Sequence, residues 1–545
     1  MSLDSIHIER GLLEWDAWFK ETQVQCADVQ IQRLSSLESA LAQLENRQIA
    51  ENMVWDIVPR LLCLLKEPTL AQVQRILRIC TEIGNAKELF LMYIEGLRSI
   101  RRNTNTEDNE EVAIIGRHQR DSYLIQIITL YECLETGTFL ATNPNNNKLY
   151  GIIIDFAKQR AIGLSQWLSD CDEEKDRQRE ILHSFIVQIF ELFFREKSNH
   201  WSLRYYRLIN PHKISFQRDK HDVHFDGMVN SLKNIAVDTN FDLAISWKLG
   251  SILEIKNNST EYQSLNSLSN NIIPSYGLLF LLGAYVFENL SVIQDHTITK
   301  FLDHMKMTIM SLNHGPITSS LIDTNLFLGL SILNNLQNIS TIDQQHFLEY
   351  TKVLSFISSS SDDSSLRFLS YSLIYQSLIR HSEDTTIMYI SNTLDTSPFK
   401  NVKTVVVNIL KDEIQRHWDD SSSAFISCVY NSLLKKIFRP NSFNQFNCIE
   451  TFLQNFNFIM QALNLYIFLL KKPGDDKTGT KSKTNMIETK KYWIDPLMYI
   501  TIYLITQLTQ HESSHSKEKI LLLLKYTLDQ IHEITKHLLD SNSTQ

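Results

Sequence analysis

Apolar residues recur along this chain at the spacing of one face of an α-helix, and this periodicity constrains the fold more than any other feature. Between Leu70 and Ile83 the apolar positions fall at offsets 0, 3, 6, 7, 10 and 13, which is typical of an amphipathic helix. The same pattern recurs from Leu182 to Phe193 and from Leu521 to Leu538. No segment shows a two-residue period of comparable strength, so we expect an all-α fold.

Turn-forming residues are scarce in this chain. It has 15 glycines and 10 prolines in 545 residues, against average usage of about 7% and about 5%. This scarcity favours long helices, because sandwiches and doubly wound folds need many Gly- and Pro-rich turns. Helices of about 12 to 20 residues with short polar breaks are typical of stacked helix pairs. The sequence therefore predicts a HEAT/armadillo-like helical-repeat solenoid, in which 51–67 and 70–83 form one hairpin and 86–102 begins the next.

Polar segments divide the predicted stack, because they cannot bury enough apolar surface to offset the entropy cost of ordering them. Short mobile loops are expected at Asn103–Glu111 and Ser358–Ser365. The predicted organisation is an N-terminal repeat region at 1–256, a polar linker at 257–271, a middle repeat region at 272–470, a flexible loop at 471–491 and C-terminal helices at 492–545.

Charge and cysteine usage exclude several classes of protein. The 53 basic and 62 acidic residues give a net charge of −9, which argues against a chain-wide nucleic-acid surface. The seven cysteines are widely spread and form no CxxC pair, so neither a disulfide scaffold nor a structural zinc site is expected. The N-terminus lacks the apolar run of a signal peptide, and no apolar stretch suits a membrane span. We expect a cytoplasmic protein, with nuclear entry left open, that binds neither membrane nor nucleic acid directly.

One catalytic pattern is present, HExxH at His511, Glu512 and His515. Histidines four residues apart on a helix can share a Zn²⁺ ion, with the glutamate as general base, and Glu533 could be proposed as a third ligand. The paired serines between the histidines favour a cap or turn, and Lys517 stands where zinc proteases usually have an apolar residue. A solvated helix–helix junction is the favoured interpretation, and a zinc hydrolase is the remote alternative.

Two further patterns resemble known sites weakly. Residues 474–482 are one position out of register with a phosphate-binding P-loop, because Thr480 separates the second glycine from the lysine. A cluster of potential metal ligands consists of Asp219, His221, Asp222, His224 and Asp226. No further ligands or supporting partners are visible for that cluster. We therefore expect a flexible insertion and a solvated loop, with no cofactor and no catalytic residue.

A basic and aromatic segment lies between Arg195 and His221. Its seven basic and two acidic residues give a local charge of +5, and aromatic residues are interleaved with them. Such a segment can hold an acidic peptide by charge-assisted hydrogen bonds and stacking. The alternative is a helix-capping segment whose aromatic residues belong to the core. We predict a partner-binding surface formed by Trp201, Arg204, Tyr205, Arg207 and Lys213.

The cysteines divide by their surroundings. Cys63 and Cys80 belong to apolar helix stripes and are expected to pack in the core. Cys171 stands between two aspartates, whose negative charge disfavours the thiolate. The sequence therefore identifies no reactive cysteine.

Two short segments near the N-terminus form a distinctive pair. WDIVPRLL contains Trp55, Asp56 and Pro59, and IGNAKELFL contains Gly84 and Asn85. Together they resemble the N-terminal signature of the glomulin and YAP-binding-protein family, except that an alanine replaces the usual proline after the Gly-Asn pair. The physical roles of these residues are structural. Asp56 could cap a helix restart before Pro59, Trp55 could pack on the preceding turn, and Gly84 suits a left-handed helix stop.

The resemblance implies a non-enzymatic helical-repeat protein that holds other proteins. Fungal members of the family bind a stress-responsive bZIP transcription factor and help a thiol peroxidase oxidise it after exposure to peroxide, and this is the function that we expect. The resemblance leaves open a kinetochore-associated scaffold, with kinetochore subunits as partners. It also leaves open a glomulin-like inhibitor that binds a cullin-RING ubiquitin ligase.

Overall fold

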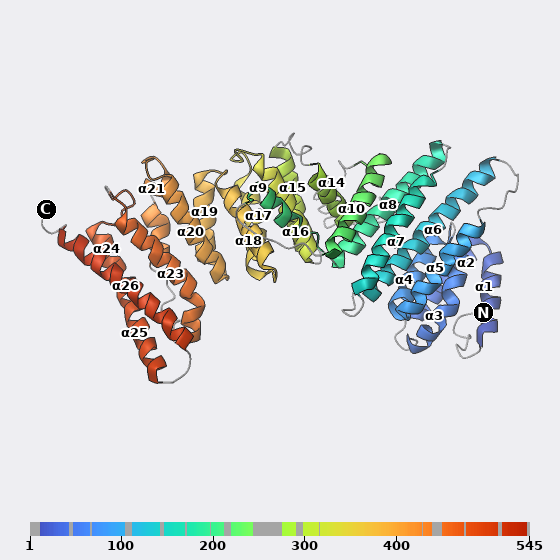
Figure 1. The fold of residues 1–545 in the computed structure, drawn as a ribbon, viewed down its shortest axis with the longest axis horizontal. Helices are drawn as coiled ribbons and strands as arrows, with labels where there is room; N and C mark the ends of the chain where they lie inside the picture. The colour runs from blue at the N-terminus through green and yellow to red at the C-terminus, as the bar shows by residue number, and fades with distance from the viewer. Residues whose placement is uncertain are drawn as a thin grey trace. The chain divides into compact units, whose positions relative to one another are not determined.

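The computed structural model describes residues 11–42, 47–65, 68–103, 112–141, 147–168, 172–196, 198–211, 220–242, 275–289, 298–314, 317–427, 429–438, 449–473, 476–510 and 515–541. Every described secondary-structure element is a helix, so the predicted all-α class is confirmed for these residues (Figure 1). Helices contact their neighbours in sequence and, in many cases, the next helix but one. This is the contact pattern of a helical-repeat solenoid, as the sequence predicts.

The chain forms two compact units, of which the first comprises residues 1–295 and 306–331. Its helices are α1 (Gly11–Val24), α2 (Ala27–Ala42), α3 (Arg47–Leu62), α4 (Leu70–Ile83), α5 (Ala86–Asn103), α6 (Val112–Ala141), α7 (Asn147–Gln166), α8 (Asp172–Glu196), α9 (Trp201–Ile209), α10 (Lys220–Asp238), α14 (Ser275–Glu288) and most of α16 (Ser319–Asn334). The predicted hairpin of 51–67 with 70–83 corresponds to α3 packed against α4, and 86–102 corresponds to α5. The predicted linker at 257–271 lies outside the described residues.

The second unit comprises residues 296–305 and 332–545. Helix α15 (Ile298–His314) has residues in both units. The other helices of the second unit are α17 (Gln344–Ser360), α18 (Ser364–Leu378), α19 (Glu383–Thr396), α20 (Lys400–Arg416), α21 (Ala424–Ser427), η5 (Tyr430–Leu434), α22 (Lys435–Phe438), α23 (Ile449–Lys471), α24 (Lys483–Thr489), η7 (Lys490–Ile494), α25 (Asp495–Gln510) and α26 (His515–Ser541). None of the described helices is long and apolar enough to span a bilayer.

Phe194 on α8 lies at the centre of an aromatic core in the first unit. Its ring centroid is 5.0 Å from that of Trp201 on α9, 5.1 Å from Phe225 on α10 and 4.6 Å from Phe280 on α14. Aromatic pairs at such distances contribute beyond the area that they bury. One side chain therefore ties together four helices, α8, α9, α10 and α14.

The Ser358–Ser365 segment is not the mobile loop predicted for it. Helix α17 continues to Ser360, and α18 begins at Ser364. The Asp363 carboxylate accepts a hydrogen bond from the backbone N–H of Ser365 at 2.7 Å and so caps α18. The serine-rich composition was misleading because these residues continue and cap helices instead of separating them.

The expectation of a flexible loop at 471–491 is also wrong for its described residues, 471–473 and 476–491. The hydroxyls of Thr478 and Thr480 are buried and lie 2.8 Å apart, and Ser482 caps α24. Lys477 Nζ donates to the Trp418 carbonyl at 2.9 Å. Helix α24 then continues through η7 into α25. This segment is ordered by polar contacts, which apolar periodicity does not report.

The family-signature residues have roles that differ from those expected. Helix α3 runs through Pro59, and Asp56 lies inside that helix instead of capping a restart. Trp55 is 49% exposed, so it does not staple the preceding turn. Gly84 has φ −77° and ψ 166°, which is extended backbone and not a left-handed stop. Asn85 accepts a hydrogen bond from the Lys87 N–H at 3.1 Å and thereby caps α5.

Close packing explains Gly84. A Cβ atom there would lie 2.8 Å from Leu89 Cδ1 and 3.0 Å from both the Cys80 carbonyl oxygen and Val54 Cγ1. The signature glycine therefore allows α3, α4 and α5 to approach one another closely. This is a constraint from tertiary structure, whereas a left-handed stop would have been a local one.

Gly277 provides a test of helix approach in the first unit. A Cβ atom at this position of α14 would lie 2.0 Å from the Val187 carbonyl oxygen on α8. We expect Gly277→Ala to lower the free energy of unfolding by about 1 to 3 kcal/mol, because the backbones must separate. Gly163→Ala on α7 is the matched control, since nothing lies within 4 Å of its added Cβ, and it should stabilise by about 0.5 to 1 kcal/mol. Urea denaturation followed by circular dichroism measures both, and equal effects would contradict the predicted clash.

Candidate functional site

The described aromatic side chains of the predicted partner surface, Trp201 and Tyr205, belong to the core. Trp201 is 1% exposed and Tyr205 4% exposed. Trp201 packs against Phe194, and the Tyr205 ring centroid lies 5.6 Å from that of Phe327 on α16. The prediction that Trp201 and Tyr205 contact a partner is therefore wrong for this conformation, because their apolar faces are already covered. The alternative interpretation, a helix-capping segment with core aromatics, agrees with the structure.

Asp323 holds the start of α9. Its carboxylate accepts hydrogen bonds from the backbone N–H of Trp201 at 2.7 Å and from that of Ser202 at 3.1 Å, and the Ser202 hydroxyl also donates to it. The carboxylate thus accepts from N–H groups that a helix start leaves without a partner in the helix. Burial raises the pKa of the Asp323 carboxyl, and the hydrogen bonds from Ser202 and Trp201 oppose that rise. The arrangement fixes α9 against α16 and serves the fold.

One of the charges of the same segment, that of Arg204, is paired within the chain. Arg204 Nη1 lies 3.0 Å from Asp226 Oδ1, and its guanidinium lies 4.5 Å from the Phe287 ring centroid. Arg207 is half-buried on α9. Lys213 lies outside the described residues. The structure therefore does not bring the five predicted contact residues onto one open surface.

The metal-site patterns receive no support from the described residues. His511 and Glu512 lie outside them, and no described helix contains both histidines of the HExxH pattern, because α25 ends at Gln510 and α26 begins at His515. Asp219 also lies outside the described residues. In the part of the chain that is described, no group of three or more His, Cys, Asp or Glu residues could hold a metal ion.

The described cysteines differ in exposure. Cys80 and Cys133 are buried, and burial raises the pKa of each thiol to about 12. Cys26 and Cys63 are exposed. The prediction that Cys63 packs in the core is wrong, because its side chain is exposed in the turn that follows α3. Its Sγ atom lies 3.5 Å from the Pro59 carbonyl oxygen. A reactive thiolate therefore cannot come from Cys80 or Cys133 in this conformation.

Glu132 on α6 is a buried acid. Burial, followed by repulsion from Glu135, raises the pKa of its carboxyl from 4.5 to about 8. Thr81 Oγ1 lies 3.3 Å from Glu132 Oε2 and donates to it. A perturbed acid can mark an active site, but Glu132 lines none of the described cavities. It is therefore a core residue that is held protonated near neutral pH.

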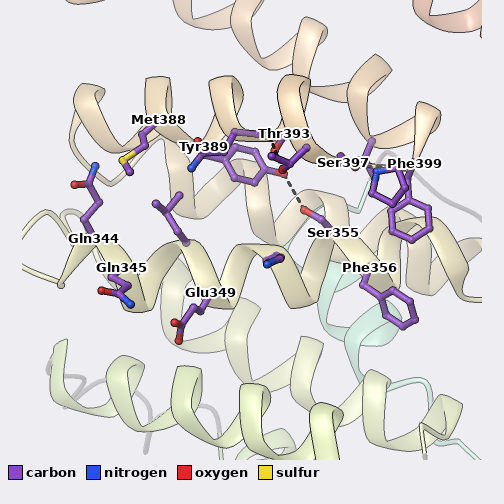
Figure 2. A pocket seen from close by; sticks show the side chains of 16 residues that line it. Gln344, Gln345, Glu349, Ser355, Phe356, Met388, Tyr389, Thr393, Ser397 and Phe399 are labelled. Atoms are coloured by element: carbon purple, nitrogen blue, oxygen red, sulfur yellow. Dashed lines mark hydrogen bonds between the residues drawn. The ribbon is translucent and has the colours of Figure 1, made fainter.

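A groove between α17 and α19 is the candidate binding site. It has a volume of about 750 Å³ and is closed at one end by residues 397–399 and by Val402 of α20. One stripe of each helix lines it, and Figure 2 shows these side chains facing one another across the groove. On α17 the lining runs from Gln344 to Phe356, which at 1.5 Å per residue is about 18 Å. That length accommodates about three turns of a helix.

The groove has a buried floor and apolar anchor points on its rim. Tyr389 is buried in the floor, and its hydroxyl lies 3.0 Å from Ser355 Oγ (Figure 2). Burial raises the pKa of Tyr389, so its hydroxyl stays neutral. Phe356 and Met388 are each 43% exposed. Of the lining residues only Glu349 and Lys352 carry formal charges, one of each sign. The site therefore suits a largely apolar, uncharged segment of a protein.

Sequence analysis missed this groove, although a signal for it was present. The buried stripe of α17 consists of Phe347, Tyr350, Thr351, Leu354 and Ile357. Phe356 lies outside that stripe, and Met388 likewise lies outside the buried residues of α19. An apolar residue on the polar face of a predicted helix is the pattern that could have identified the site.

The comparison with known families gives one match. A sequence model titled Kinetochor_Ybp2 and described as YAP/Alf4/glomulin matches residues 19–137 and 168–519. These ranges include the groove residues of α17 and α19 and both short segments that carry the resemblance. No curated protein matches the sequence.

Glu132 generates a prediction for pH dependence. Its pKa is about 8 in the folded chain against 4.5 as the ordinary value, so between these values the folded state holds a proton that the unfolded state has lost. The free energy of unfolding should therefore fall as pH rises through this window, with a contribution on the order of 3 kcal/mol already lost at pH 7. Glu132→Gln should remove this dependence and stabilise the chain at pH 7. Urea denaturation between pH 5 and pH 8 measures the pH dependence of the free energy of unfolding. The control Glu180→Gln, at an exposed position of α8, should leave that dependence unchanged.

Proposed function

Because this chain belongs to the YAP/Alf4/glomulin family, we propose that it is a non-enzymatic adaptor that binds a stress-responsive bZIP transcription factor and promotes its oxidation by a thiol peroxidase after exposure to peroxide. The helical-repeat fold and the family support a protein-interaction scaffold. The observation that carries the proposal is the apolar groove between α17 and α19, with Phe356 and Met388 exposed on its rim.

The adaptor acts by proximity in this proposal. Peroxide oxidises the peroxidase thiolate to a sulfenic acid, a thiol of the factor condenses with it and releases water, and a second thiol of the factor resolves the mixed disulfide and returns the reduced peroxidase. Holding the factor and the peroxidase on one scaffold converts the encounter into an effectively intramolecular step. The adaptor contributes no atom to these reaction steps.

The groove suits one helical segment of a partner. Apolar side chains at positions i, i+3, i+4 and i+7 of an amphipathic helix would fill it, because its length corresponds to about three helical turns. Aromatic and methionine side chains at such sites often contribute most of the binding energy. The near-neutral lining favours an apolar face over a charged peptide.

The kinetochore and cullin-RING alternatives make different predictions about what the same groove holds. Affinity purification of the full chain from peroxide-treated and untreated cells distinguishes them. Recovery of a peroxidase and a bZIP factor that increases after treatment supports the proposal. Recovery of kinetochore subunits or of a cullin, unchanged by peroxide, would replace it with the corresponding alternative.

Truncation of the groove anchors tests the binding site. We expect Phe356→Ser and Met388→Ser each to weaken binding of the recovered partner by about tenfold, since each removes an apolar contact worth on the order of 1.4 kcal/mol. Phe368→Ser is the matched control, because Phe368 on α18 is 44% exposed and does not line the groove. Calorimetry or surface plasmon resonance measures the affinities. If Phe368→Ser weakened binding as much as the groove variants, the groove would be the wrong site.

A cysteine series tests whether the chain is a thiol relay. The variant Cys26→Ser/Cys63→Ser removes both exposed thiols that the structure describes. We expect it to support peroxide-dependent oxidation of the factor at the wild-type rate, as measured on non-reducing gels with purified components. A variant in which all seven cysteines are replaced should do the same if circular dichroism shows it folded. Loss of oxidation in either folded variant would show that the chain itself carries the oxidising equivalent.

A further inference from the structure

The C-terminal helices expose an unusual concentration of apolar side chains. Of the 20 large hydrophobic residues that are exposed in the described part of the chain, eight lie between residues 487 and 526. Tyr499 on α25 is 74% exposed and Tyr526 on α26 is 62% exposed. A concentration of exposed apolar side chains marks an interaction site more often than isolated residues do.

One stripe of α26 combines apolar residues with charges of opposite sign. Lys519, Leu522, Tyr526 and Asp529 are all exposed and stand at intervals of three, four and three residues, so they lie along one face of the helix. A basic residue stands at one end of this stripe and an acidic residue at the other. Neither Lys519 nor Asp529 has an ion-pair partner among the described residues.

The stripe is complementary to itself. When two copies of α26 pack antiparallel about a two-fold axis midway between Leu522 and Tyr526, Leu522 of each copy meets Tyr526 of the other. In the same register, Lys519 of each copy meets Asp529 of the other, so two equivalent ion pairs flank an apolar centre. Positions paired in this way correspond to the core positions of an antiparallel coiled coil.

Other pairings of the same stripe bring like charges together. A parallel pair places Lys519 against Lys519 and Asp529 against Asp529. An antiparallel pair centred further along the helix places Lys519 against Lys536, and the next such register places Asp529 against Glu533. Like charges in direct opposition are destabilising. The charge pattern therefore favours the register centred between Leu522 and Tyr526 over these three pairings.

Helix α25 extends this surface. A depression of about 410 Å³ between α25 and α26 is lined by Ile494, Asp495, Met498, Tyr499 and Ile502 on one side and by Lys525, Asp529 and His532 on the other. Asp529 belongs to both the stripe and the depression. The apolar surface available to a second copy is thus wider than a single helix face, and it includes tyrosines, which are enriched at interface hot spots.

We propose that the chain forms a two-fold symmetric homodimer through the α26 stripe, with Lys519 and Asp529 of the two copies paired reciprocally. This proposal is independent of the proposed adaptor function, because it involves a different surface and no partner other than a second copy. Residues 522–529 also lie beyond residue 519, where the family match ends.

Sedimentation velocity on the full chain tests the dimer. Wild-type protein should sediment at twice the chain mass of 63.4 kDa at tens of micromolar and dissociate on dilution. Lys519→Glu and Asp529→Lys should each weaken the dimer at least tenfold, because each turns two attractive contacts into repulsive ones. Lys517→Glu is a control outside the stripe and should leave the dimer unchanged.

Charge exchange distinguishes direct pairing from a loss of folding. The double variant Lys519→Glu/Asp529→Lys should dimerise again, and mixing the two single variants should give a heterodimer, since their altered charges are complementary to each other. A wild-type chain that stays monomeric at these concentrations would overturn the proposal. A dimer that single reversal leaves intact, or that the double variant fails to restore while circular dichroism shows it folded, would overturn it as well.

Discussion

Burial of one apolar stripe per helix is the constraint on which the rest of this structure depends. A single amphipathic helix cannot cover its own stripe, so each helix packs against its neighbours in sequence, and the stack grows by repetition. Phe194 shows how far this packing reaches, because its ring contacts aromatic residues of α9, α10 and α14. Glycines at close helix approaches follow from the same constraint, since Gly84 and Gly277 stand where a Cβ atom would collide with a neighbouring helix.

Apolar periodicity predicted the elements of this fold well and their surroundings poorly. The helices predicted at 70–83 and 86–102 and the apolar face from Leu521 to Leu538 follow directly from spacing and correspond to α4, α5 and α26. Spacing identifies which face of a helix is apolar but does not say what covers it. The sequence therefore predicts a partner for Trp201 and Tyr205, although Phe194 and Phe327 already cover them in the structure. Composition was misleading at 476–491, because it predicted a flexible loop there. Buried threonine hydroxyls and a helix cap order this segment instead.

Two buried acids of the first unit have contacts that maintain the fold. Asp323 receives three hydrogen bonds from the start of α9, so its polar atoms are satisfied where water is excluded. Glu132 avoids the cost of a buried charge by keeping its proton, which is the effect of its raised pKa. Neither acid lines one of the three cavities described for the chain.

The groove between α17 and α19 and the stripe of α26, both in the second unit, suit different binding partners because their charges differ. The groove between α17 and α19 is nearly neutral and concave, so a separate apolar segment fits it without a specific charge pattern. The stripe of α26 is exposed, and its opposite charges are placed to match a copy of itself. Since both surfaces belong to the same unit, a dimer formed through α26 would carry two grooves. For a partner that is itself dimeric and long enough to reach both grooves, the second contact would form at the high effective concentration set by the first.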